Sequence, residues 1–323
     1  MHQITGRWRL GLLLSLATVS MWGVLPIVLK LLLAHMDAAT ITWFRFMIAA
    51  LVVGIYLAAR KRIPDVGGLS KNARWMLLVA IIGLGGNYLL YLLSLNLISP
   101  GTAQVVIQLA PIMLMAGGLA FFGERFQRRQ WVGVLILVTG LGLFFNDRLT
   151  ELFSGLGAYT SGVVMVVVAS ASWATYALVQ KQLLLHLGSN QIMFLLYFTL
   201  MLLFWPWSHP SAILELNGLA IGLLLFASIN TLIAYGAFAE ALNHWQASRI
   251  SAVLAVTPLL TLYFAEIYSR SFPDQLAAEN LGTLALFGAA LVVGGSIMTA
   301  LGGGKKENAQ TGAGPVRRGK LKG

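Results

Sequence analysis

The sequence predicts an all-α membrane protein whose ten transmembrane helices form two inverted five-helix repeats, and three observations lead to this fold class. The first is composition: the 323 residues are 58% hydrophobic and 10% charged, with a mean hydropathy of +0.80, whereas a soluble domain carries about 25% charged residues. The second is the recurrence of apolar runs near the ~20 residues that a helix needs to cross a bilayer. The third is an internal repeat.

Within lipid, a backbone must satisfy its own hydrogen bonds, which only helices and closed β-barrels do. The sequence lacks the alternating segments of ~10 residues that are typical of barrel strands, so we expect helices. Ten spans follow one another through short loops, at residues 10–33, 38–59, 75–97, 101–122, 130–145, 158–182, 190–207, 218–241, 247–268 and 280–301.

The two ends of the chain lie outside these spans. Arg7 and Arg9 precede the first apolar run as in a signal peptide, but that run is long and has no Ala-x-Ala cleavage site. We therefore expect an uncleaved first helix. Residues 303–323 form a basic, glycine-rich tail that we expect to be disordered. The tail could contact anionic membrane lipids, or it could be solvated and only reinforce the orientation.

The basic residues indicate how the chain is oriented. With the N-terminus in the cytoplasm, 18 of the 22 lysines and arginines lie on the cytoplasmic side, in the termini, the loops or the ends of spans, and only Arg148 and Arg270 lie on the outer side. This is the positive-inside bias of a multi-pass membrane protein, so both termini are expected in the cytoplasm. The net charge of +11 therefore gives no reason to expect nucleic acid as a partner.

The internal repeat rests on scarce residue types that recur at fixed offsets. At an offset of 151, the matching pairs are Trp22/Trp173, Lys30/Lys181 and His35/His186. At an offset of 147, they are Tyr88/Tyr235, Asn96/Asn243, Val106/Val253 and Pro111/Pro258. Fixed self-similarity predicts two structural repeats, residues 1–150 and 151–302. Because five spans are an odd number, the second repeat would be inverted, as in many secondary transporters. The alternative is a duplicated membrane protein without transport activity.

Several short motifs resemble one transporter family. They are Ser20-Met21-Trp22-Gly23, Trp43-Phe44-Arg45-Phe46, Ala110-Pro111 and Gly123-Glu124-Arg125, followed by a glycine-rich fifth span. Their order over residues 10–301 resembles the EamA branch of the drug/metabolite transporter superfamily. The resemblance implies a ten-helix carrier of the bacterial inner membrane, with a central cavity lined mainly by helices one, three, four, six, eight and nine. It does not identify a substrate.

The second half departs from this pattern. Trp173 is followed by Ala174, and Leu196 stands where the first half has Arg45. Roles that the resemblance implies for the first half therefore transfer less securely to the second.

A set of polar and aromatic residues lies away from the ends of the expected spans. Gln104 and Gln108 are four residues apart and share one helical face, which continues to Pro111. Such groups could orient a small metabolite against aromatic walls, or could simply form hydrogen bonds between helices. The candidate substrate-binding residues are Trp22, Asn87, Tyr88, Tyr91, Gln104, Gln108, Trp173, Tyr176, Asn230 and Tyr235.

Two prolines lie near the middle of their spans. Pro111 and Pro258 each free the carbonyl four residues earlier, that of Ile107 or Leu254. They could act as paired hinges of an alternating-access cycle, or as static kinks, since proline is common in membrane helices.

Four charged residues are candidates for gates. Arg45, the deepest charge, could attract a carboxylate, pair with Glu266 as an outer latch, or snorkel to the interface. Lys181 and Glu240 could form an inner latch or simply face the surface. All four aspartates fall in loops, and no carboxylate lies near the midplane. The sequence therefore does not support proton coupling, although Glu240 or Glu266 could still serve.

Enzyme classes are not indicated. The chain has no cysteine, and the His-Glu-x-x-His and Gly-x-Ser-x-Gly signatures are absent, so we expect no catalytic site, cofactor or metal. Glycine-rich stretches in the fifth and tenth spans could stabilise the fold or a homodimer. The predicted function is alternating-access transport of small metabolites, chiefly export of amino acids or related compounds. The alternatives are a passive channel and a non-transporting scaffold or sensor.

Overall fold

The computed structural model describes residues 7–122, 127–153, 155, 157–245, 247–279 and 281–302. This part of the chain is helical and contains no strand. The Gly123-Glu124-Arg125 motif and the tail 303–323 lie outside the described residues.

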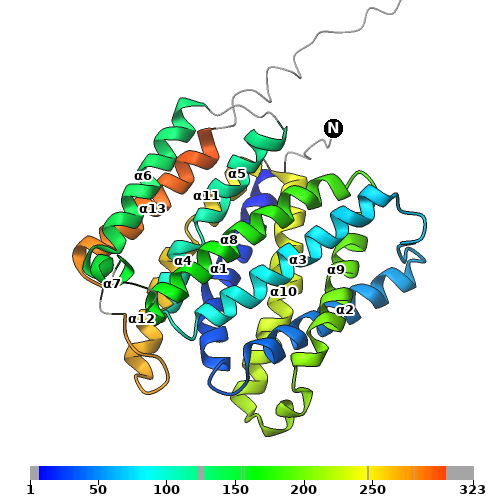
Figure 1. Ribbon diagram of the computed structural model, residues 1–323, viewed down its shortest axis with the longest axis horizontal. Helices are drawn as coiled ribbons and strands as arrows, with labels where there is room; N and C mark the ends of the chain where they lie inside the picture. Colours follow the sequence, from blue (N-terminus) through cyan, green and yellow to red (C-terminus); the bar gives the residue numbers. More distant parts are fainter. Residues whose placement is uncertain are drawn as a thin grey trace, which may run out of the picture.

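Thirteen α-helices are described (Figure 1). They are α1 (Trp8–Leu32), α2 (Ala38–Ala59), α3 (Lys71–Ser94), α4 (Pro100–Val106), α5 (Leu109–Phe122), α6 (Arg128–Phe144), α7 (Leu149–Phe153), α8 (Ala158–Leu183), α9 (Ser189–Phe204), α10 (Gly218–His244), α11 (Ala247–Leu254), α12 (Thr257–Ser271) and α13 (Thr283–Gly302). Short 3-10 turns follow α6 (Asn146–Arg148) and α9 (Trp205–Trp207, Pro210–Glu215).

Nine helical segments of the described chain are long and apolar enough to cross a membrane. Two of them combine neighbouring helices, α4 with α5 and α11 with α12. A tenth span results if α6 is counted together with the helical segment Asn146–Leu152, which is bent away from it by 55°. The fold is therefore that of a multi-pass helical membrane protein, with nine to ten spans at the positions where the sequence predicts them.

Polar side chains fix where several helices begin. Asp37, Ser70, Ser99 and Asn217 precede α2, α3, α4 and α10, and each side chain accepts a hydrogen bond from the N–H group three residues later. These caps satisfy N–H groups that have no partner within the helix. The starts of these four helices are therefore set by local side chains.

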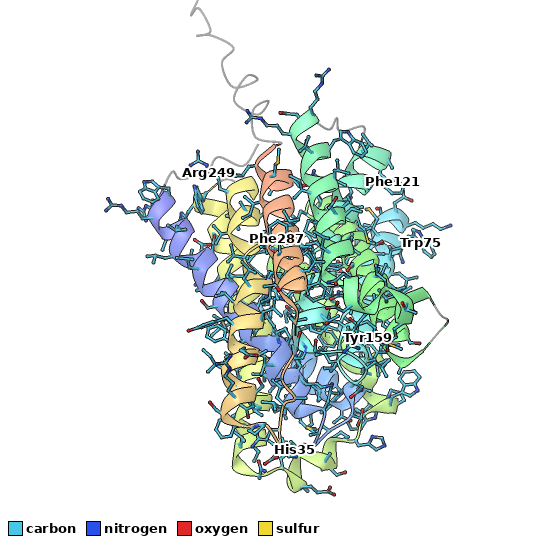
Figure 2. The ribbon with its side chains drawn as sticks, turned by 90° about the vertical axis from the view of Figure 1, so that its left-hand side faces the viewer. His35, Trp75, Phe121, Tyr159, Arg249 and Phe287 are labelled. Carbon is cyan, nitrogen blue, oxygen red and sulfur yellow. The ribbon has the colours of Figure 1, made fainter. Side chains whose placement is uncertain are left out.

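Helices from the two halves of the chain pack against one another. The closest associations are those of α6 with α13, α3 with α8, α1 with α10 and α2 with α9. Helix α1 begins at the end of the bundle where the N-terminus is marked, whereas α8 begins at the opposite end (Figure 1). We call these the termini end and the opposite end. Figure 2 places Trp75, Phe121 and Arg249 near the termini end and His35 near the opposite end.

Glycines allow α6 and α13 to approach closely. A Cβ atom on Gly140 would lie 2.6 Å from the backbone nitrogen of Val292, and one on Gly288 would lie 2.4 Å from that of Phe144. By contrast, a Cβ on Gly142 or Gly294 would meet nothing within 4 Å. The close glycine contacts thus hold the two last spans of the halves together within one chain. The homodimer stays a prediction.

Candidate functional site between the two halves

Two spans are interrupted, and their interruptions meet. The first gap separates α4 from α5 at Ile107 and Gln108, and the second separates α11 from α12 at Ala255 and Val256. Gln108 Nε2 donates a hydrogen bond to the carbonyl oxygen of Ala255 at 2.9 Å. These two residues are 147 positions apart, the offset of the repeat. The bond therefore joins equivalent positions of the two halves.

The predicted hinge prolines lie just after these interruptions. Pro111 is in the first turn of α5 and Pro258 is in the first turn of α12, where the missing N–H group is tolerated. The carbonyl of Ile107 accepts the N–H of Ala110 at 2.9 Å, and the carbonyl of Leu254 accepts the Thr257 hydroxyl at 2.5 Å. The freed carbonyls are thus satisfied locally, as an apolar environment requires. Movement at these points stays a prediction.

Three of the candidate amides bond to the backbone of a neighbouring helix. Besides Gln108, Asn87 Nδ2 donates to the carbonyl of Ala169 on α8 at 3.0 Å, and Asn230 Nδ2 donates to that of Met21 on α1 at 2.8 Å. Each bond connects one half to the other. In this conformation the three amides therefore form hydrogen bonds between helices, which is the alternative to substrate binding that the sequence left open. The buried oxygen Oδ1 of Asn230 has no partner among the described residues.

The other candidates form an aromatic centre. Trp22 and Tyr235 meet edge to face with ring centroids 5.2 Å apart. Phe46 packs against Tyr88 at 4.7 Å and Tyr197 at 5.9 Å. Phe46 and Tyr197 were not among the predicted residues, yet they are 151 positions apart, so the repeat offset was the signal that could have found them.

The remaining candidates flank this centre. The Tyr91 hydroxyl donates to Gln104 Oε1 at 2.8 Å. Tyr176 is buried, with its hydroxyl 3.4 Å from Met193 Sδ, and Trp173 packs partly buried against the core. Tyr88 is thus buried in the core of the bundle, and Tyr235 and Trp173 are partly buried against that same core.

Arg45 points into this centre. Its residue surface is 4% exposed, its Nε donates to the Thr231 hydroxyl at 3.2 Å, and its guanidinium carbon lies 4.6 Å from the centre of the Tyr88 ring. The Tyr197 hydroxyl donates to the backbone carbonyl of the same Thr231 at 3.5 Å. The side chain is therefore buried and connects α2 to α3 and α10. Thr231 was missed because a threonine in an apolar span is unremarkable in sequence.

The proposed partner of Arg45 lies elsewhere. Glu266 accepts a 2.7 Å hydrogen bond from Nε of Arg270, and both side chains are at least two-fifths exposed. An Arg45–Glu266 pair is therefore not formed, because a neighbour one helical turn away satisfies the carboxylate. At the termini end, Glu240 Oε1 lies 3.0 Å from His244 Nε2, and Lys181 is exposed on the last turn of α8. The inner latch stays a prediction.

A different acidic residue closes the opposite end. Glu279, in the loop before α13, accepts the N–H of Gly101 at the start of α4 at 2.8 Å. A Cβ on Gly101 would lie 2.7 Å from both Glu279 oxygens and 2.3 Å from Leu262 Cδ2. Burial raises the pKa of the Glu279 carboxyl above its usual value. This contact could not be predicted from the sequence, because a glutamate in a loop is most often exposed to solvent.

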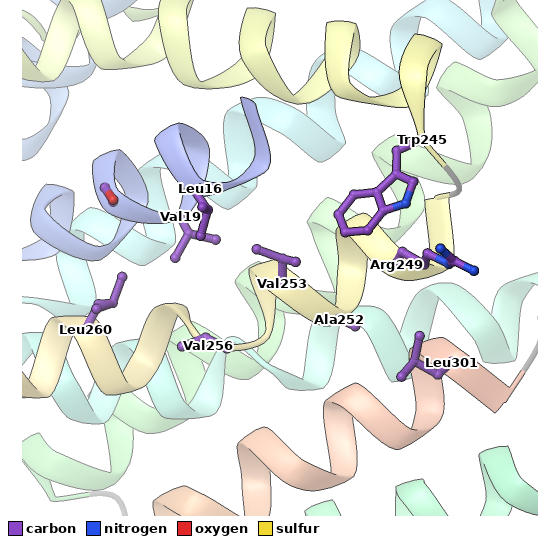
Figure 3. Close-up of a pocket in the computed structure, with 10 residues that line it drawn as sticks. Leu16, Val19, Trp245, Arg249, Ala252, Val253, Val256, Leu260 and Leu301 are labelled. Atoms are coloured by element: carbon purple, nitrogen blue, oxygen red, sulfur yellow. The ribbon is translucent and has the colours of Figure 1, made fainter. Parts of the chain in front are cut away.

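A groove of about 670 Å³ lies on the side of the bundle (Figure 3). Leu16 and Val19 of α1 line one wall, and Arg249 of α11 and Leu301 of α13 lie towards the termini end. The groove reaches Val256, in the interruption between α11 and α12. Its lining is mostly apolar, so it is distinct from the polar centre around Arg45.

A multi-pass helical bundle whose interrupted spans meet at the interface of two halves is an arrangement found in membrane transport proteins. The EamA-like transporter family matches residues 9–146 and 160–301 separately, so the chain belongs to the EamA-like transporter family.

Relatives of known sequence agree with this assignment. The chain is 40% identical over 295 residues to the "Uncharacterized inner membrane transporter YhbE" of Escherichia coli K12, covering 91% of this chain and 92% of that one. It is 39% identical over 293 residues to an "Uncharacterized transporter" of Haemophilus influenzae, covering 91% and 95%. With nine to ten apolar spans, the protein is a multi-pass inner-membrane transporter.

The chain is also similar to more distant proteins. A "Probable amino-acid metabolite efflux pump" of Salmonella typhimurium is 24% identical over 307 residues, covering 90% of this chain and 94% of that protein. A solved crystal structure superposes with a TM-score of 0.60 over 91% of this chain and 97% of its own, at 16% identity. This last likeness concerns the fold alone.

Proposed function

We infer that the protein is a secondary transporter that moves small metabolites, chiefly amino acids or related compounds, out of the cell by alternating access. The observation that carries this proposal is the Gln108–Ala255 hydrogen bond, which joins the two interruptions. Interrupted spans at the interface of two repeats are the places where secondary transporters hold substrate. Because each interruption divides a span into two short helices, the two ends of the bundle can move separately.

The proposal includes an inverted relation between the halves. The family matches each half separately, and α1 and α8 begin at opposite ends of the bundle (Figure 1). The association of α3 with α8 repeats that of α10 with α1, as a two-fold relation between the halves requires. A pseudo-two-fold axis in the membrane plane would pass between Gln108 and Ala255.

The side chains at the centre favour a small amphipathic substrate. Trp22 and Tyr235 supply apolar surface, while Tyr91 and Gln104 supply polar groups. A few polar groups on aromatic walls are typical of small-molecule sites. The efflux pump named for amino-acid metabolites supports this substrate class. The excess of basic residues at the termini end supports a cytoplasmic location for that end.

Saturable counterflow in proteoliposomes tests the proposal. The purified chain would be reconstituted with one amino acid or metabolite inside, and uptake of the labelled compound measured. We expect uptake that saturates and is accelerated by internal substrate. Flux that does not saturate would indicate a channel, and a lack of transport for every compound would indicate a scaffold or sensor.

The hinges require a separate test. We expect Pro111→Ala and Pro258→Ala each to slow counterflow, because a continuous helix resists bending at the interruption. Leu196→Ala, away from both interruptions, controls for a general loss of packing. If both proline variants transported at the unmodified rate and affinity, the prolines would be static features.

A further inference from the structure

We propose that the Arg45 guanidinium is the binding group for the carboxylate of the substrate, so that the transported compounds are small carboxylic acids, including zwitterionic amino acids. The inference rests on the proposed function and names the chemistry of its site. It differs from a latch, because the partner of Arg45 is then the cargo.

The first argument is burial without a counter-charge. Arg45 is 4% exposed and lies about 10 Å along α2 from its first residue, at 1.5 Å per residue. No carboxylate of the described residues lies within 4.0 Å of it. Arg270 shows the contrast, because it is largely exposed and yet paired with Glu266 at 2.7 Å. A buried charge in a membrane protein marks a functional site by default.

The second argument is spare hydrogen-bonding capacity. A guanidinium has five N–H donors in a planar fork, and within the described chain Arg45 uses one of them, on Thr231. The Tyr88 hydroxyl beside it is buried and forms no hydrogen bond of standard geometry within the described chain, although the Tyr235 side chain lies close enough to interact with it. The fork geometry matches a carboxylate with two parallel hydrogen bonds. The groups left free at this point are therefore those that a carboxylate would satisfy.

The third argument is position. Arg45 belongs to the first half, whereas Thr231 belongs to α10 in the second half. The tyrosines at this point come from both halves: Tyr88, whose ring Arg45 overlies, from the first, and Tyr197, whose hydroxyl donates to the Thr231 carbonyl at 3.5 Å, from the second. A ligand bound here would contact both halves at once, which couples its binding to their relative movement.

The fourth argument is asymmetry. The position equivalent to Arg45 in the second half is Leu196, which is fully buried. If Arg45 served only to hold a repeated helix in place, a similar polar contact would be expected at its counterpart. The centre therefore has one cationic group for one anionic group of the cargo.

The test compares compounds that differ only in the carboxylate. Proteoliposomes with the full chain would be assayed for counterflow of the twenty amino acids, small mono- and dicarboxylates, and the amines that correspond to the amino acids without their carboxylate. We expect saturable transport of carboxylates and none of the amines. Transport of amines at rates similar to those of their amino acids would overturn the inference while leaving the transporter function intact.

Variants of Arg45 sharpen the result. We expect Arg45→Gln to raise KM for carboxylates by about 10- to 150-fold, the effect of losing a charged hydrogen bond. Arg45→Lys should raise KM less and restore much of the selectivity. The matched control is Arg60→Gln, because Arg60 also lies over a tyrosine ring, that of Tyr56 at 5.7 Å, but both residues are exposed.

Each remaining outcome is decisive. Unchanged KM in Arg45→Gln would overturn the inference. If that variant fails to fold, as shown by size-exclusion chromatography, the selectivity of the unmodified chain and the KM of Arg45→Lys decide. A lack of saturable transport for all compounds would overturn the proposed function and the inference together.

Discussion

The two interrupted spans, α4–α5 and α11–α12, occupy equivalent places in the two halves but have different surroundings. All seven residues of α4 are buried, and Glu279 closes its first turn. On α11, Arg249 and Ser251 are exposed, and the helix borders an open groove that reaches the interruption (Figure 3). The two interruptions lie at equivalent positions of the repeat, but the packing around them differs.

This difference shows which features are local. Each half breaks its helix a few residues before a proline, so the break follows from sequence. Whether the span is covered at its start depends on tertiary contacts, since Glu279, which covers α4, comes from a loop 178 positions away from Gly101. Under alternating access, a closed opposite end and an open groove at the termini end would correspond to one state of the cycle.

Gly101→Ala should have the largest effect on stability. Its methyl group would overlap Leu262 and the Glu279 carboxylate, and overpacking of this kind costs about 1–3 kcal/mol. Thermal unfolding in detergent would measure the loss. Gly222→Ala on α10 is the control, because a Cβ there meets nothing within 4 Å and should be neutral or stabilising. Equal effects of the two variants would contradict a closed first span.

Gln108→Leu should have the next largest effect. It removes the hydrogen bond to Ala255 and so leaves a carbonyl without that donor at the centre, at a cost of about 0.6–2 kcal/mol in a membrane protein. Thr257→Val, which removes a local bond within the second span, is the matched control. Of these two variants, we expect Gln108→Leu alone to slow counterflow, because its bond joins the halves whereas that of Thr257 lies within one span. Similar transport rates in both variants would show that the link has no role in the cycle.

The Glu279 carboxyl predicts a pH dependence of stability. Because its pKa is raised in the folded protein, its contribution is fully present below the usual value of 4.5 and is lost as pH rises through the raised pKa. The Arg148 and Glu266 charges near it act in opposite directions, the first lowering and the second raising this pKa. As pH rises, the melting temperature of the unmodified chain should therefore fall relative to that of Glu279→Gln. A difference that is constant with pH would contradict the raised pKa.

Asp37 provides a control of opposite sign. Burial raises its pKa, but hydrogen bonds from Thr40 and His209 outweigh this, so the pKa is lowered overall. Its contribution is therefore present above the usual value of 3.8 and is lost as pH falls. Melting of Asp37→Asn should approach that of the unmodified chain at low pH.

Filling the groove should have the smallest effect on stability. Ser20 lines it, and Ser20→Leu places a larger apolar side chain in open space, so we expect a change within about 0.5 kcal/mol. If the groove takes part in the cycle, the same variant should slow counterflow without lowering the melting temperature. A marked loss of stability would show that the groove has too little free space for a leucine side chain at this position.

The sequence by itself determined the class of protein and the course of the chain. Apolar runs of fixed length give the spans because the thickness of the bilayer sets the length of a helix. The motif around Arg45 and the two offsets identified the family, and the family matches both halves. Prolines marked the interrupted spans because a missing N–H group is a local property of the chain.

Only the tertiary structure decided which residues meet. It placed Arg45 against Thr231 and Tyr88 rather than Glu266, joined Gln108 to Ala255 and brought Glu279 to Gly101. The physical reason is that a side chain's partners depend on which helices lie side by side and on their rotation about their axes. Helices in lipid associate through packing and a few hydrogen bonds distributed over the whole chain, so no single segment contains that information.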